Sequence, residues 1–195
     1  IASSTSALLM SEIQKAVKRP ERCVIVHPVN PAHIVPFVDI VPGLNTSKET
    51  VNLTYEFMSN LGKTAVICKK EVPGFVVNRL QAALYREAFD LVDKGVATVE
   101  DVDKAITAGL GLRWAFMGPF LVMHLGGGEK GIEYWLTQLS NSYKTRWESM
   151  TTWSSIPESA RKKTVEGIRS YELLRGRQYS DLVKWRDEKL VKLLR

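Results

Sequence analysis

Strand-like and helix-like hydrophobic patterns alternate in the first third of the chain. Residues 23–26 and 65–68 are short apolar runs of the kind that form buried strands, and residues 37–41 predict a further strand. Ser/Thr hydroxyls and an early glutamate predict a helix over 47–61, between the last two of these strands. Strands that alternate with helices are typical of an α/β layer, but these strands are too few to complete a doubly wound domain.

The chain opens on what reads as a strand end and a small-residue turn over residues 1–6. A short helix is expected over 7–18, because the preceding Ser and Thr hydroxyls can accept from its first free N–H groups, and Pro20 ends it. Two prolines within residues 27–31 predict an extended, irregular path after the apolar run.

The pattern becomes helical after residue 72. Apolar positions over 75–94 follow the spacing of a helix with one buried face, whereas residues 109–118 are rich in glycine and aromatic residues and are expected to form a loop. Further helices are predicted over 98–108, 119–125, 129–143, 158–175 and 180–194. We therefore predict an α/β remnant over 1–72 followed by an all-α domain over 73–195.

The composition is that of an ordinary globular chain: of 195 residues, 45% are hydrophobic and 25% are charged. No apolar run approaches the ~18 residues that a membrane helix needs, so no membrane attachment is expected. Two cysteines, Cys23 and Cys68, indicate no disulfide framework and favour a reducing, cytoplasmic setting.

The formal net charge of +6 resides in one segment. Residues 161–195 contain 11 Lys/Arg and 5 Asp/Glu, whereas the other 160 residues contain 16 of each. Basic and acidic side chains mix along this segment, which is typical of a solvated helix face; a surface for a partner or an anionic ligand is the alternative. A nucleic-acid-binding module is a further alternative, but no nucleic-acid partner is expected because the rest of the chain is neutral.

Two side chains in the α/β part could share a proton-transfer task. His27 ends an apolar strand, and strand ends in open α/β sheets face the ligand crevice, where an imidazole can take and return a proton. Asp39 lies on the next strand; if the two strands pair, its carboxylate could fix the tautomer of His27 and stabilise the imidazolium. The alternatives are a structural histidine bonded to the backbone and an acid that faces water.

Other polar and aromatic residues could contact a substrate. Ser6 offers a hydroxyl and Asn78 an amide to a reacting oxygen, although both could instead serve local helix-end bonding. Arg113 can pair with a carboxylate, while Trp114 and Phe116 can face a quaternary ammonium; a packed loop cluster is the alternative.

The glycine-rich and histidine-containing segments predict neither a dinucleotide fingerprint nor a metal site. Gly109-Leu110-Gly111 and Gly126-Gly127-Gly128 do not follow a strand and open a helix in the G-x-G-x-x-G manner. The histidines lack the Cys/His spacing of a metal site.

Four segments, taken in their order and spacing, carry a resemblance to a known family. They are Ser3-Ser4-Thr5-Ser6, His27-Pro28-Val29-Asn30-Pro31, Phe37-Val38-Asp39-Ile40-Val41 and Val72-Pro73-Gly74-Phe75-Val76-Val77-Asn78-Arg79-Leu80. Together they resemble the 3-hydroxyacyl-CoA dehydrogenase superfamily, from the catalytic half of its NAD-binding Rossmann domain through its helical domain.

The resemblance implies a role for each matching residue. His27 matches the general base, and Ser6 and Asn78 match polar residues that contact the reacting oxygen of the substrate. Asp39 falls where the family usually has a glutamate paired to that histidine, and it is one methylene shorter. Ser6 and Asn30 are expected to contact NAD, and a homodimer is expected, as in the family.

The stretch from Gly109 to Pro119 resembles the L-gulonate 3-dehydrogenase (lambda-crystallin) and L-carnitine dehydrogenase subgroup, whose substrates are small free 3-hydroxy acids. This implies NAD-dependent oxidation of a gulonate- or carnitine-like 3-hydroxyl, with Arg113 as the carboxylate clamp. Because the family's G-x-G-x-x-G turn would lie upstream of Ile1, we expect a fragment whose activity requires the nucleotide-binding half. The alternatives are a 3-hydroxyacyl-CoA dehydrogenase and a catalytically weak, crystallin-like structural dimer.

Overall fold

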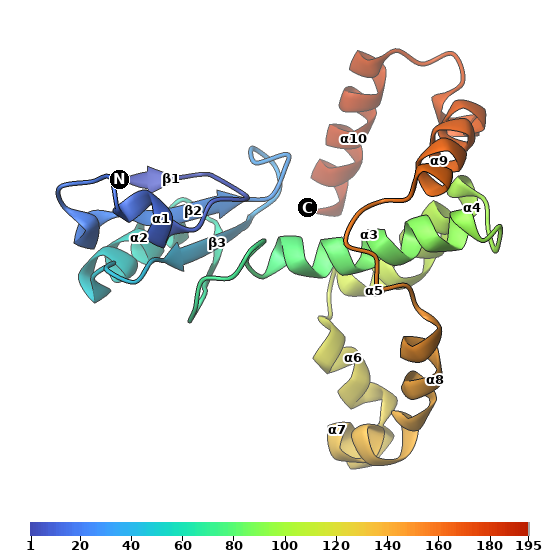
Figure 1. Ribbon diagram of the computed structural model, residues 1–195, viewed down its shortest axis with the longest axis horizontal. Coiled ribbons are helices and arrows are strands. Elements are labelled where there is room, and N and C mark those ends of the chain that lie inside the picture. The colour runs from blue at the N-terminus through green and yellow to red at the C-terminus, as the bar shows by residue number, and fades with distance from the viewer. Residues whose placement is uncertain (195) are drawn as a thin grey trace. The chain divides into compact units, whose positions relative to one another are not determined.

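The computed structural model describes residues 1–194 and divides them into two compact units. The first unit holds Ile1–Ala83 together with the segment from Gln178 onward, and the second holds Leu84–Arg177. Figure 1 shows a small sheet with flanking helices in the blue and cyan part of the chain and helices in the green to orange part. A small sheet followed by a helical region is the fold class that the sequence predicts.

A four-stranded mixed sheet forms the centre of the first unit, in the order β1-β2-β3-β4 (Figure 1). β1 pairs parallel with β2, β2 pairs antiparallel with β3, and β3 pairs parallel with β4. The strands are β1 (Ala2–Ser3), β2 (Val24–Pro28), β3 (Phe37–Pro42) and β4 (Thr64–Ile67). β2 therefore continues through His27 and Pro28, where the sequence predicted an irregular path.

Side chains of β2 and β3 are buried on both faces of the sheet, as their unbroken apolar runs predict. One face packs against α1 (Met10–Gln14), and the other against α2 (Lys48–Asn60). Because side chains alternate along a strand, Ile25 and His27 share one face of β2. Buried on the α1 side are Met10, Cys23, Ile25, Val41, Cys68 and Phe75.

The two helices that cover the sheet begin differently from one another. α2 begins after Ser47, whose hydroxyl accepts from the N–H of Thr50, as the sequence predicts. The helix expected over 7–18 is only α1, and its N-terminal residue Leu9 makes no side-chain cap. The Thr5 hydroxyl instead accepts from two N–H groups within its own turn, so the start of the expected helix is a turn.

The second unit is helical. α3 (Val77–Asp93) runs from the first unit into the second, since the division falls after Ala83. The other helices are α4 (Val99–Lys104), α5 (Gly111–Trp114), α6 (Pro119–Gly126), α7 (Gly131–Tyr134), α8 (Asn141–Ser149) and α9 (Glu158–Ser170), and α10 (Tyr179–Leu193) belongs to the first unit. The expected domain boundary near residue 72 stays a prediction.

The expected loop over 109–118 is wrong for its first part. A π-helical turn over Ala105–Leu110 leads directly into α5. Gly111 permits this close turn, because a Cβ there would lie 2.8 Å from the carbonyl oxygen of Ile106. The glycine thus extends the helical path, where the sequence suggested a break.

Two further helix predictions need correction. The helix expected over 129–143 is divided into α7, a π-helical turn over Trp135–Leu139, and α8. The helix expected over 158–175 ends at Ser170 and is followed by a 3-10 turn over Glu172–Leu174. No single helix within residues 1–194 has the length and apolar character needed to cross a membrane; the stretches Val99–Trp114 and Pro119–Gly126 reach it only jointly, with a bend of 83°.

Candidate functional site

His27 and Asp39 lie directly opposite one another on β2 and β3. Cross-strand partners in an antiparallel pair project from the same face, so the two side chains face one another within the α1 side of the sheet. The Nδ1 atom of His27 is 3.8 Å from Oδ2 of Asp39, and the two residues are 7% and 0% exposed. The pairing on which the sequence hypothesis depended is therefore present.

The separation is nevertheless longer than those of the N–H hydrogen bonds in this site, and well beyond the most common N–H···O distance of about 2.9–3.0 Å. Nδ1 of His27 is buried and has no hydrogen-bond partner among the described residues. An aspartate side chain is one methylene shorter than that of a glutamate. That difference in length is comparable to the distance by which Oδ2 of Asp39 falls short of a hydrogen bond to Nδ1 of His27. The pair is thus held in ion-pair range without a direct hydrogen bond.

Asn78 meets the other ring nitrogen of His27. It is the second residue of α3, and its Nδ2 atom is 3.4 Å from Nε2 of His27. The amide can donate to an unprotonated Nε2, which is the nitrogen that would accept a proton. The site therefore aligns an acid, an imidazole and an amide, all within the first unit.

A sharp turn between β4 and α3 brings Asn78 to this position. Gly74 and Phe75 both have left-handed backbone angles, with φ of 80° and 51°. The ring of Phe75, which is 1% exposed, packs edge-on against His27 with centroids 5.5 Å apart. A left-handed phenylalanine is rare, and such conformations cluster at functional sites.

Burial dominates the electrostatics of the acid. It raises the pKa of the Asp39 carboxyl above its ordinary value, and the N–H of Val77, the charge of His27 and the thiol of Cys68 oppose that rise. The Val77 N–H donates to Oδ2 at 3.5 Å, and the Cys68 thiol donates to Oδ1 at 3.9 Å. Burial, followed by the charge of Asp39, raises the pKa of the Cys68 thiol to about 11.

Ser6 and Asn30 lie apart from this hydrogen-bonded cluster. Both are exposed, Ser6 in the bend after β1 and Asn30 in the turn after β2. Within residues 1–194 neither forms a hydrogen bond to His27 or Asn78. Their expected contacts with substrate and NAD stay predictions.

Arg113, Trp114 and Phe116 belong to the second unit. Arg113 and Trp114 are in α5, and Phe116 follows it with its N–H donating to the carbonyl of Arg113. Trp114 is 40% exposed and Phe116 75%, so both rings reach the surface. Their role in substrate binding stays a prediction.

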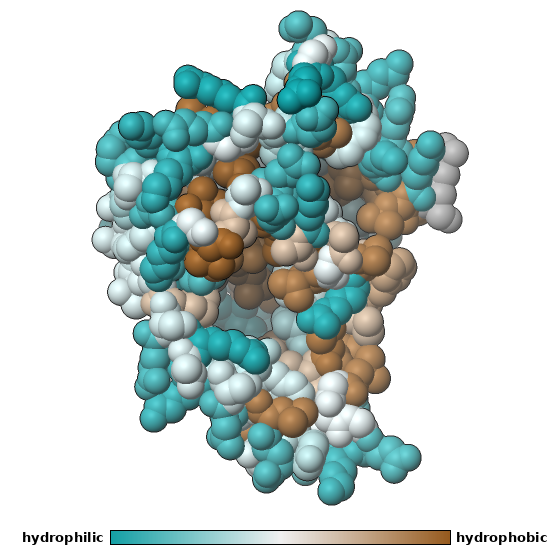
Figure 2. Space-filling model, turned by 90° about the vertical axis from the view of Figure 1, so that its right-hand side faces the viewer, coloured by the Kyte–Doolittle hydropathy of each residue, from teal (hydrophilic) through white to brown (hydrophobic). Residues whose placement is uncertain are grey.

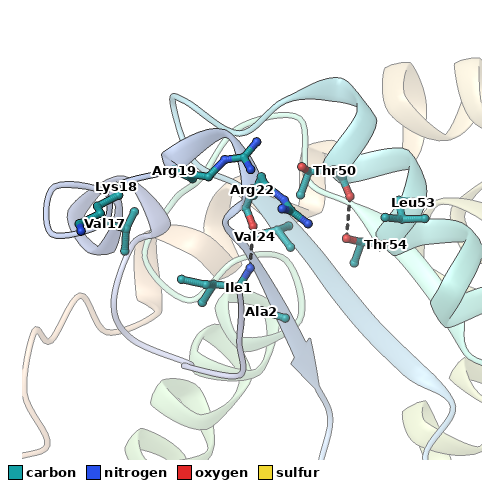
Figure 3. Close-up of a pocket in the computed structure, with 10 residues that line it drawn as sticks. All are labelled: Ile1, Ala2, Val17, Lys18, Arg19, Arg22, Val24, Thr50, Leu53 and Thr54. Carbon is teal, nitrogen blue, oxygen red and sulfur yellow. Dashed lines mark hydrogen bonds between the residues drawn. The ribbon is translucent and has the colours of Figure 1, made fainter.

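A pocket of about 480 Å³ in the first unit lies elsewhere (Figure 3). None of the candidate catalytic residues lines it. The lining residues are Ile1, Ala2, Val17, Lys18, Arg19, Arg22, Val24, Thr50, Leu53 and Thr54. The described residues contain no group of three or more His, Cys, Asp or Glu side chains arranged to hold a metal ion.

The residues of this chain fit the reacting end of a dinucleotide better than its pyrophosphate. His27 and Asn78 place polar groups at the carboxyl end of β2, the edge at which ligands bind in open α/β sheets. Within residues 1–194, no glycine-rich turn that would cradle the pyrophosphate connects a strand to a helix. The fit is therefore to the reacting end of the cofactor.

Sequence reasoning missed Cys68 and Phe75 as neighbours of this cluster. Cys68 ends an apolar run and Phe75 begins an apolar helix face, so both read as core. No local pattern shows that β4 pairs with β3 or that the turn before α3 is left-handed. Pairing of β4 with β3 is the information that would have identified Cys68.

Family models match most of the chain. Residues 1–72 match the NAD binding domain of 3-hydroxyacyl-CoA dehydrogenase, and residues 74–171 match its C-terminal domain. The chain is similar to L-carnitine dehydrogenases, with 41% identity over 194 residues to that of Bacillus cereus and 40% to that of Oceanobacillus iheyensis. Both matches cover 100% of this chain but only 59% and 62% of the relatives.

Solved structures give a consistent result. FHMPC 5-dehydrogenase, described as an NAD+-dependent dismutase, aligns with a TM-score of 0.84 at 31% identity over 100% of this chain and 62% of that one. A 3-hydroxyacyl-CoA dehydrogenase from Archaeoglobus fulgidus aligns with a TM-score of 0.65 at 28% identity, covering 99% and 66%. The chain thus spans about 60% of the length of the curated relatives that it matches.

Proposed function

Because this chain belongs to the 3-hydroxyacyl-CoA dehydrogenase family, we propose that it carries the proton-transfer and substrate-binding part of an NAD-dependent 3-hydroxy acid dehydrogenase. The observation that supports this most is the alignment of Asp39, His27 and Asn78 within one unit. In the proposed reaction the substrate hydroxyl loses its proton and the adjacent carbon loses a hydride, which leaves a ketone.

Nε2 of His27 accepts the hydroxyl proton. This nitrogen faces the amide of Asn78, so the amide stands beside the oxygen that loses the proton and donates to it as negative charge develops. Bound NAD supplies the hydride acceptor in this chemistry. The imidazolium that forms is stabilised by the buried carboxylate of Asp39, whose Oδ2 is 3.8 Å away.

The proposed substrate is a small free 3-hydroxy acid of the carnitine type. Similarity to L-carnitine dehydrogenases at about 40% identity supports this class. In the proposal Arg113 pairs with the substrate carboxylate. Trp114 and Phe116 are exposed aromatic rings near it in sequence, and they offer faces to a quaternary ammonium.

Activity is proposed to require a dinucleotide-binding region that these residues do not supply, since their G-x-G-x-x-G run, residues 126–131, begins at the end of the helix α6 and not after a strand. A homodimer is also proposed, because Phe116, Phe120 and Trp147 are more than two-thirds exposed. Figure 2 shows apolar side chains, in brown, at the surface among polar ones. Two buried, unpaired cysteines support a cytoplasmic location.

A catalytically weak, crystallin-like dimer is the second candidate. It is favoured by one observation, the buried Nδ1 of His27 without a hydrogen-bond partner. If the gap to Asp39 persists during turnover, the imidazolium is stabilised less than in a directly bonded pair. A 3-hydroxyacyl-CoA dehydrogenase is the alternative within the same chemistry, since solved relatives include such enzymes.

NADH absorbance distinguishes these candidates. The chain is joined to the part of the Bacillus cereus relative that it does not cover and is assayed with L-carnitine, L-gulonate and 3-hydroxybutyryl-CoA. We expect turnover with L-carnitine, and His27→Ala should lower it about 10²–10⁴-fold, the usual contribution of a general base. His33→Ala, at an exposed histidine in the same unit, is the control and should keep wild-type turnover. Near-normal turnover of His27→Ala would contradict the proposal.

A further inference from the structure

Cys68 contacts the acid of the candidate site from the strand next to it. The residue follows β4 directly, and its N–H donates to the carbonyl of Ile40 at 2.8 Å, which continues the parallel ladder with β3. This bond fixes the backbone at the point where the side chain turns toward Asp39. Cys68 is 5% exposed, and its thiol donates to Oδ1 of Asp39 at 3.9 Å.

The two oxygens of Asp39 have different partners. Oδ2 faces the N–H of Val77 at 3.5 Å and Nδ1 of His27 at 3.8 Å. Oδ1 faces the Cys68 thiol, which is the donor that the described residues provide to this oxygen. Rotation of the carboxylate would therefore break contacts on both sides at once.

We propose that Cys68 is a positioning residue of this site: its thiol donates to Oδ1 of Asp39 and so holds Oδ2 toward His27. The proposal rests on the function proposed above and adds a third residue to the Asp39–His27 pair. Cys68 acts through Asp39 and touches neither substrate nor cofactor in this account.

The chemistry of the thiol suits this task. Its pKa of about 11 keeps it protonated, and hence a donor, across the neutral range. A donor to the ionised carboxylate favours the charged form and so opposes the rise in the Asp39 pKa that burial causes. Among the described residues, the titratable groups that face Asp39 are His27 from β2 and Cys68, which follows β4. An ionised Asp39 is the form that stabilises an imidazolium.

Cys23 provides a matched control. It lies in the same apolar cluster, is 0% exposed, and donates its thiol to the carbonyl of Arg19 at 3.5 Å. The two cysteines thus share burial and packing and differ in the acceptor. If Cys68 served only to fill the core, replacing either cysteine should affect the chain in the same way.

The first experiment follows the Asp39 side-chain carboxyl carbon by NMR as a function of pH, in the chain labelled with 13C-aspartate. Cys68→Ala and Cys68→Val should move the Asp39 titration to higher pH, because both remove the donor. Cys68→Ser should move it less than either, since a hydroxyl also donates although its C–O bond is shorter than the C–S bond, and Cys23→Ser should not move it. If Cys68→Val kept the wild-type midpoint of the Asp39 titration and Cys68→Ser did not, the proposal would be overturned, because packing would then explain the effect of Cys68.

A second measurement covers the case in which Cys68→Ala fails to fold. The infrared S–H stretch of Cys68 is recorded in Cys23→Ser, where one thiol remains. The band should move as the pH passes the Asp39 titration, because the acceptor then gains a proton. A band that stays constant through that titration would overturn the thiol contact in a chain with its Cys68 intact.

Turnover then connects the contact to catalysis. In an active enzyme, Cys68→Ala should lower kcat about twofold, the rate equivalent of a weak hydrogen bond such as a thiol makes, and Cys68→Ser should restore part of it. Unchanged kcat and pH profile in Cys68→Ala would overturn the positioning role. The NMR and infrared measurements need neither substrate nor NAD, so an inactive enzyme in which they succeed contradicts the proposed function and leaves the contact standing.

Discussion

The Asp39 carboxyl is under two opposing influences. It is wholly buried, which favours the neutral acid, and it faces donors that favour the carboxylate. A buried charge without such donors would cost several kcal/mol, and the N–H of Val77, the charge of His27 and the thiol of Cys68 all favour the carboxylate here. Because His27 gains a positive charge in the proposed reaction, the carboxylate matters most at the moment of proton transfer.

Asp39→Asn should therefore reduce catalysis while keeping the shape of the side chain. The amide cannot stabilise the imidazolium and can impose the wrong tautomer on His27, so kcat/KM should fall about 10²-fold or more. Asp187→Asn, at the acid that pairs with exposed His33, is the control and should keep wild-type kcat/KM. Equal activity of the two variants would remove Asp39 from the mechanism.

Ionisation of Asp39 should lower the free energy of unfolding as the pH rises. The pKa of Asp39 is raised in the folded chain above its ordinary value of 3.8, so the folded state binds the proton more tightly than the unfolded state does. Its contribution to stability is present below that ordinary value and is lost as the pH rises through the higher folded pKa. Urea unfolding across this window should show wild type losing stability relative to Asp39→Asn. A stability difference independent of pH would contradict this.

At the scale of elements, the turn between β4 and α3 positions the site. Two consecutive left-handed residues, Gly74 and Phe75, redirect the chain so that a ring packs on His27 and the first turn of α3 places Asn78 at Nε2. Strain of order 1–3 kcal/mol is typical of a left-handed bulky residue. The long helix is thus connected to the sheet through a conformation that the surrounding core must hold.

Gly74→Ala should disturb both stability and catalysis. Gly74 has a φ of 80°, which an alanine rarely adopts. A Cβ added at this residue would also lie 3.3 Å from Cγ of Arg79. Gly95→Ala is a matched control, since Gly95 has φ of 68° and nothing within 4 Å of its Cβ position. Both should lose about 1 kcal/mol in chemical unfolding, but only Gly74→Ala should also lower kcat. A normal kcat in Gly74→Ala would show that the turn does not position Asn78.

Patterns local in sequence predicted the strands, the Ser47 cap of α2 and the extent of α3, because hydrophobic period and capping chemistry act over a few residues. The short α1 and the continuous path through Gly111 were not predicted. At these places a hydroxyl bonds within its own turn, and a glycine permits a close π-helical approach. A threonine such as Thr5 can begin a helix or form a turn, and a glycine such as Gly111 can break a helix or permit a close turn within it.

The residues of the candidate site also include some that local patterns predict and some that they do not. His27, Asp39 and Asn78 were predicted from their residue types and order, and the structure brings them together. Cys68 reaches Asp39 through pairing between strands separated by an intervening helix, which no short-range pattern encodes. The distance between Nδ1 of His27 and Oδ2 of Asp39 likewise depends on tertiary packing. The length of the aspartate side chain alone does not determine it.

On the scale of the whole molecule, the basic segment of the sequence is distributed between units. α9 belongs to the second unit and α10 to the first, so the excess charge does not form one domain of its own. Several of its cations pair with nearby acids, as in Arg161–Glu158, Arg175–Glu172 and Arg186–Asp187. These short-range pairs agree with a solvated surface, and exposed pairs of this kind contribute little to stability.

The pH dependence of kcat/KM with L-carnitine and NAD, in wild type and in His27→Gln, tests the central claim most directly. A protonated imidazole cannot accept the hydroxyl proton, so the wild-type rate should fall on the acid side with a limb that reports one group. His27→Gln should retain substrate binding, lose turnover about 10²–10⁴-fold, and lose that limb. A variant that kept both its rate and the acid limb would show that another group takes the proton, and would contradict the account.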